Sequence, residues 1–65
     1  GSYAAKEITN AISRFTEEYR APFTMYLAGY KYGEIADRMH LPLGTVKSRI
    51  FLARKRLRKM LGEYR

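Results

Sequence analysis

Residues 41–61, LPLGTVKSRIFLARKRLRKML, decide the fold, because they lack acidic residues and repeat apolar side chains at helical spacing. When 43–62 are wound at about 100° per residue, an apolar stripe forms around Val46. Its members are Val46, Ile50, Ala53, Leu57, Met60 and Leu61. The other side carries Lys47, Ser48, Phe51, Leu52, Lys55, Arg58 and Lys59. The pattern predicts one long helix that packs into a core on one side and meets an anion on the other.

The charge of the chain is concentrated in its last third. Residues 1–40 hold five basic and five acidic side chains, whereas 41–65 hold eight basic ones against Glu63 alone, which gives the whole net charge of +7. This asymmetry indicates a polyanionic partner, with nucleic acid ahead of an anionic membrane. A membrane-bound last helix would leave the preceding helices without a core partner. The remaining alternative is a solvated face that only aids solubility.

The residues before this segment predict three shorter helices. Apolar side chains at i, i+3, i+4 and i+7 indicate a first helix over about 3–14; they are Ile8, Ala11, Ile12 and Phe15. Thr16, followed by two glutamates, is typical of a second helix start, and Gly29 of its end. We expect its inner face to comprise Tyr19, Phe23, Tyr26, Leu27 and Tyr30. Because proline lacks a donor, Pro22 predicts a later start or a kink.

A third helix is predicted over about 32–39, with Ile35, Ala36 and Met39 facing inward and Lys31 as a poor cap. The proline at residue 42 and Gly44 then favour a turn, with His40 on its surface and Leu41 filling it. A short helix, a tight turn and a longer basic helix form a helix-turn-helix. The fold is therefore expected to be all-α, a four-helix small domain with a C-terminal helix-turn-helix and a long basic recognition helix.

Length and composition limit the other possibilities. The 65 residues permit one domain with a small core. We expect the domain to span 3–65, with Gly1 and Ser2 a cloning scar. There is no cysteine, which is compatible with a cytoplasmic protein, and no apolar run is as long as a membrane span. Neither a metal site nor a cofactor site is expected, and no constellation of catalytic side chains indicates an enzyme.

The string YGEIADRMHLPLGTVKSRIFLARKRL resembles the fourth conserved region of bacterial RNA polymerase sigma factors, of the extracytoplasmic-function type. Its most specific parts are Y-x-E-I-A and P-x-G-T-V-K-S-R, and EEYRAPFTMYLAGY resembles the preceding helical segment. The helix-turn-helix of response-regulator activators is the nearest alternative, since it also carries E-I-A and T-V-K. It usually lacks the proline-x-glycine and the serine-arginine pair.

The resemblance implies a domain that docks on the polymerase flap and reads the promoter −35 element in the major groove of double-stranded DNA. The DNA-facing positions of the family map onto Lys47, Ser48, Phe51 and Leu52. Tyr32 and Gly33 map onto contacts with the DNA backbone. Many relatives have arginine in place of Leu52 and an acidic residue in place of Gly33, so their base preference does not transfer.

Side-chain chemistry adds to this surface. The amides of Gly44 and Thr45 at a helix N-terminus favour a phosphate, although Thr45 can equally cap the helix. Lys47 and Ser48 can reach base edges or phosphates. Three further cations supply diffuse attraction to phosphates: Lys55, Arg58 and Lys59. Arg49 lies at the edge of the core stripe, so an ion pair with Glu34 or Asp37 is expected.

Two alternatives to a promoter-recognition module stay open. One is the output domain of a response regulator. The other is a protein-interaction module whose apolar and basic surfaces dock an anti-sigma factor or another regulator, a function that can coexist with DNA binding.

Overall fold

The computed structural model describes residues 5–62, and within them four helices and no strand. These are α1 (Ala5–Ile12), α2 (Glu17–Leu27), α3 (Tyr32–Met39) and α4 (Leu43–Met60). The all-α prediction is confirmed, as is the order of a short helix, a turn and a long final helix. The cloning scar at Gly1 and Ser2 and the predicted helix start at residue 3 lie outside the described residues. None of the helices in this part of the chain has the length and apolar character needed to cross a bilayer.

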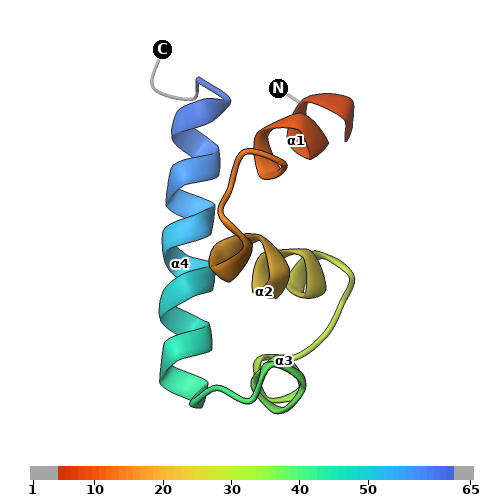
Figure 1. Cartoon of the computed structure of the whole chain (residues 1–65). Coiled ribbons are helices and arrows are strands. Elements are labelled where there is room, and N and C mark those ends of the chain that lie inside the picture. Colours follow the sequence, from red (N-terminus) through yellow and green to blue (C-terminus); the bar gives the residue numbers. More distant parts are fainter. Residues whose placement is uncertain (1–4, 63–65) are drawn as a thin grey trace.

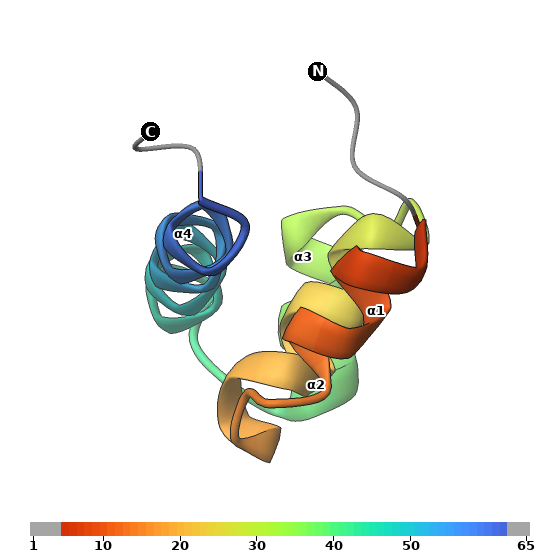
Figure 2. The same cartoon turned by 90° about the horizontal axis from the view of Figure 1, so that it is seen from above.

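Helix α4 is the longest of the described helices, and the other three pack against it (Figure 1). It packs most extensively against α2, then α3, and then α1. Figure 2 shows the three shorter helices gathered on one side of α4, with its other side uncovered. The arrangement follows from the apolar stripe, because one side of α4 alone can bury surface against its neighbours.

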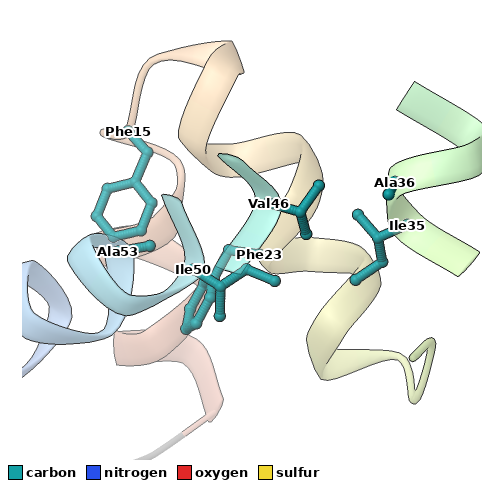
Figure 3. Close-up of a cluster of buried hydrophobic side chains, with 7 residues drawn as sticks. All are labelled: Phe15, Phe23, Ile35, Ala36, Val46, Ile50 and Ala53. Carbon is teal, nitrogen blue, oxygen red and sulfur yellow. The ribbon is translucent and has the colours of Figure 1, made fainter. Parts of the chain in front are cut away.

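The core draws side chains from all parts of this arrangement (Figure 3). Its buried members are Phe15, Phe23, Ile35, Ala36, Val46, Ile50 and Ala53, with Leu57 and Met60 packed against them. Val46, Ile50 and Ala53 are at most 2% exposed. The predicted helical phase of the last helix is therefore confirmed, and the phase fixes which side chains face outward.

The first helix is shorter than predicted. It ends at Ile12 rather than near residue 14, because the Arg14 amide bonds the Ala11 carbonyl and the Phe15 amide bonds the Ile12 carbonyl. Such i to i−3 bonds tighten the chain into a turn. The turn carries Phe15 into the core, where it is 4% exposed.

The second helix corrects two expectations. It runs without interruption from Glu17 through Pro22, which lies buried inside it, so the later start is wrong. Leu27 is 53% exposed rather than part of the inner face. It borders a hollow of about 350 Å³ together with residues of α1. Gly29 ends the helix with a φ of 104°, as predicted.

The turn between α3 and α4 is closed by a left-handed residue. His40 adopts a φ of 58°, and the Leu41 amide reaches back to the Ala36 carbonyl at 3.0 Å. This is a Schellman-type helix end, in which Leu41 then packs against the core. At the other end of α3, the Lys31 amide donates to the Glu34 carboxylate at 2.8 Å. That bond gives a definite start to a helix whose first residue lacks a good side-chain cap.

Candidate nucleic-acid interface

Figure 2 shows one side of helix α4 without a neighbouring helix. This side, opposite the buried stripe, presents a strip of basic, polar and apolar side chains. Its members Lys47, Ser48, Phe51, Leu52 and Lys55 are all exposed. Phe51 is 64% exposed and Leu52 44%, so two large apolar side chains face water within the strip. Helical spacing alone explains the strip, since these positions lie on the side away from Val46, Ile50 and Ala53.

Among the residues that the structure describes, no carboxylate neutralises the strip. No charged side chain among residues 5–62 is buried. The ion pair in this part of the chain joins Arg20 to Glu17, both on α2. Lys47 and Lys55 have no carboxylate partner within the described range. Their ammonium groups are therefore available to an external anion.

Two sequence-predicted residues from different helices meet at one edge of the strip. The Lys47 Nζ lies 6.0 Å from the centroid of the Tyr32 ring. Tyr32 stacks on Tyr26 with a centroid distance of 5.7 Å and an interplanar angle of 13°. Tyr26 in turn stacks on the buried Phe23 at 6.1 Å. A row of aromatic rings thus runs from the core to the ammonium group of Lys47, within the range of a cation–π interaction.

The start of α4 differs from the expectation at Thr45. The N-cap is Pro42, without a side-chain cap hydrogen bond, and Thr45 is the third helical residue. Its amide bonds the Pro42 carbonyl at 3.1 Å, so Thr45 is not the cap. The amides of Leu43 and Gly44 belong to the first turn and have no preceding turn to bond. Gly44 is exposed, with no atom within 4 Å of the place a Cβ would occupy.

Gly33 lies similarly open, as the second residue of α3 and directly after Tyr32. The structure therefore brings Tyr32 and Lys47 together and places Gly33 beside Tyr32. Gly44 and Thr45 lie one turn before Lys47 and Ser48. Lys55 lies two turns further along α4, where it borders a hollow with Leu52.

Arg49 does not form the predicted ion pair with Glu34 or Asp37. Its Nη1 donates to the main-chain carbonyl of Glu18 at 3.4 Å. The helical phase turns Arg49 toward α2 rather than α3. The acceptor is free because residue 22, whose amide would bond that carbonyl in a regular helix, is proline. The signal was present in the sequence as a proline four residues after Glu18.

Sequence reasoning also missed the contact of Arg38 with Tyr30. The Arg38 guanidinium carbon lies 4.6 Å from the Tyr30 ring centroid, which joins the end of α3 to the α2–α3 connection. A tyrosine eight residues before an arginine gives no periodic signal, because the intervening turn decides whether the two side chains meet.

Comparison with known families agrees with this geometry. The model of the family described as sigma-70, region 4 matches residues 5–57. No solved structure matches the chain significantly. The match covers the helix-turn-helix and both preceding helices, and it favours a sigma factor over the output domain of a response regulator. The chain therefore belongs to the sigma-70 region 4 family, the DNA-binding helix-turn-helix domains of transcription initiation factors.

Proposed function

We propose that this domain recognises the −35 element of promoter DNA as region 4 of a sigma factor of the extracytoplasmic-function type. The observation that carries the proposal is the exposed, unneutralised strip of α4, which stands opposite the buried stripe of the same helix. A helix with this division of faces fits the major groove, which admits one α-helix.

The residues take distinct roles in this proposal. Lys47 and Ser48 reach base edges, and Phe51 and Leu52 supply apolar contacts such as those with thymine methyl groups. The free amide of Gly44 and the residues Tyr32 and Gly33 face phosphates on either side of the groove, whereas the Thr45 amide is already bonded to the Pro42 carbonyl. Lys55 adds electrostatic attraction further along the helix.

Docking on the polymerase flap complements the DNA contacts. One small module buries a modest area, so the isolated domain binds DNA weakly. Attachment to polymerase raises its effective concentration at the promoter. The extracytoplasmic-function type is supported by the P-x-G-T-V-K-S-R string around the start of α4.

Selection from a randomised duplex library tests the proposal, followed by fluorescence anisotropy on the selected duplex and a scrambled version of it. We expect the selection to converge on one short motif and the selected duplex to bind more tightly. Lys47→Ala should reduce this preference, whereas Arg14→Ala, an exposed change in the turn after α1, should leave it unchanged. Absence of convergence, or failure to bind either duplex at low salt, contradicts the proposal.

A further inference from the structure

A second surface feature lies at the start of α3, beside the place where Lys47 meets Tyr32. We call this open hollow the tyrosine hollow; it is lined by Tyr26, Tyr30, Lys31 and Tyr32 and has a volume of about 360 Å³. Its residues come from the end of α2, the connection after it and the first residue of α3. The volume lies at the low end of the range for small-molecule sites, roughly 300–1,000 Å³.

The walls of the tyrosine hollow are aromatic. Tyr26 already stacks on Phe23 and on Tyr32, with centroid distances of 6.1 Å and 5.7 Å. Tyr30 is half-buried, and no ring of the described residues stacks on it. Tyr30 therefore offers aromatic surface to a planar ligand, next to rings that are held in place by the core.

Three cations surround the tyrosine hollow. Lys31 lines it, and Arg38 and Lys47 lie over two of its rings, with the guanidinium carbon 4.6 Å and the Nζ 6.0 Å from the ring centroids. All three are exposed, and no carboxylate within 5–62 forms an ion pair with any of them. The Glu34 carboxylate accepts a hydrogen bond from the main-chain amide of Lys31 rather than from its ammonium. The hollow thus combines aromatic surface with cations that are available to an anion.

From these observations we propose that the tyrosine hollow binds a nucleotide. The base stacks on Tyr30, beside the rings of Tyr26 and Tyr32, and phosphate oxygens meet Lys31 and Lys47. Aromatic rings combined with cations hold unpaired bases together with their phosphates. An aliphatic ligand would leave the cations unmatched, and a bare phosphate would leave the rings unused. The nucleotide is either free or an unpaired unit of a DNA strand, since both present the same base and phosphate.

This binding mode differs from the reading of duplex DNA, because a paired base inside a duplex is not free to stack on a side chain. Tyr32 and Lys47 nevertheless belong both to the hollow and to the residues proposed to face DNA. A nucleotide in the hollow should therefore weaken duplex binding. That consequence rests on the proposed function, whereas nucleotide binding itself does not.

Amide NMR spectra of the nitrogen-15-labelled 65-residue chain, titrated without duplex, test the proposal. The probes are ADP, adenosine, inorganic pyrophosphate and a short single strand of deoxyadenosine nucleotides. We expect ADP to shift the signals of 30–32 with a Kd of about 1 mM or lower. Adenosine and pyrophosphate should each bind at least about fivefold more weakly, because each keeps only the base or only the phosphates.

The single strand separates the two sources of the nucleotide. Tighter binding than ADP, with shifts of the same signals, assigns the hollow to unpaired DNA. Weaker binding than ADP assigns it to a free nucleotide. Both results support the same recognition chemistry.

The matched pair of variants is Lys31→Gln and Lys6→Gln. Both remove the charge of an exposed lysine, but Lys6 lies on α1 and does not line the hollow. The bond from residue 31 to Glu34 survives, since the main-chain amide makes it. Lys31→Gln should raise the Kd for ADP at least about fivefold and Lys6→Gln less than about twofold. Tyr30→Leu should also raise it at least about fivefold, the low end of what one base–aromatic stack contributes.

Circular dichroism verifies that each variant is folded. Several outcomes would overturn the proposal, and the first is the absence of saturable shifts at 30–32 with ADP. Another is pyrophosphate binding as tight as that of ADP, or equal weakening by Lys31→Gln and Lys6→Gln, since either indicates diffuse attraction of anions. An unchanged Kd in folded Tyr30→Leu would show that no base stacks on that ring.

Discussion

The guanidinium of Arg49 donates to the main-chain carbonyl of Glu18, an acceptor left without a helical amide partner by Pro22. This contact joins α4 to the first turn of α2. Both helices contribute to the core, so this hydrogen bond helps to fix α4 against α2. Pro22 on α2 and Arg49 on α4 are thus linked through the same main-chain carbonyl, which one leaves free and the other bonds.

Replacement of Arg49 should therefore depend on residue 22. Arg49→Met, which keeps an unbranched apolar stem, should lower the free energy of unfolding by about 0.5–1.5 kcal/mol, the usual contribution of one hydrogen bond. In a Pro22→Ala background the cost should be smaller, because alanine supplies the missing amide. Urea denaturation of the four proteins measures this double-mutant cycle. Equal costs in both backgrounds would show that Pro22 and Arg49 act independently.

The two faces of α4 should separate stability from DNA binding. Ile50 is 1% exposed, so Ile50→Ala should cost about 2–5 kcal/mol, enough to unfold a domain of this size. Lys47→Ala removes an exposed side chain and should change the free energy of unfolding by about 0.5 kcal/mol or less. It should weaken DNA binding. Thermal denaturation followed by circular dichroism decides this, and the reverse order of effects would contradict the helical phase.

The aromatic row beside Lys47 should affect how strongly that lysine acts. Tyr32→Phe keeps a ring under the ammonium, whereas Tyr32→Leu removes it together with about 0.5–1 kcal/mol of cation–π interaction. We expect Lys47→Ala to cost less DNA affinity in the Tyr32→Leu background than in wild type or Tyr32→Phe. Anisotropy titrations on the selected duplex give the three costs. If all three are equal, Tyr32 does not position Lys47.

Leu52 should influence the base preference. Leucine can offer only an apolar contact, for which a thymine methyl is the natural match, whereas arginine can bond guanine O6 and N7 together. We expect wild type to favour thymine at the base pair under this residue, and Leu52→Arg to shift the preference toward guanine by about 1–3 kcal/mol at most. Parallel selections from randomised duplexes compare the two proteins. Identical preferences at every position would remove Leu52 from the reading surface.

Periodicity predicted most of the fold, because a helix of 18 residues repeats its pattern often enough to fix its phase. Val46, Ile50 and Ala53 were placed correctly for this reason, and so was the exposure of Lys47, Ser48 and Phe51. Shorter helices carry fewer repeats. Leu27 was misplaced because its burial depends on how α1 packs against α2, which the local sequence does not encode.

Contacts between helices were predicted less well than the faces of single helices. The partner of Arg49 was sought among carboxylates, whereas the structure supplies a main-chain carbonyl freed by Pro22. The row from Phe23 through Tyr26 to Tyr32 requires the α2–α3 turn to bring two helices together. Sequence spacing cannot specify such contacts, because they depend on how the helices cross.

The salt dependence of binding tests most directly whether the basic side chains of α4 lie against DNA, as we propose. If about five basic side chains meet phosphates, log K on the selected duplex should fall against log salt concentration with a slope of about −4 to −5. A slope shallower than about −2 would show that most of the basic side chains of α4 are not at the interface.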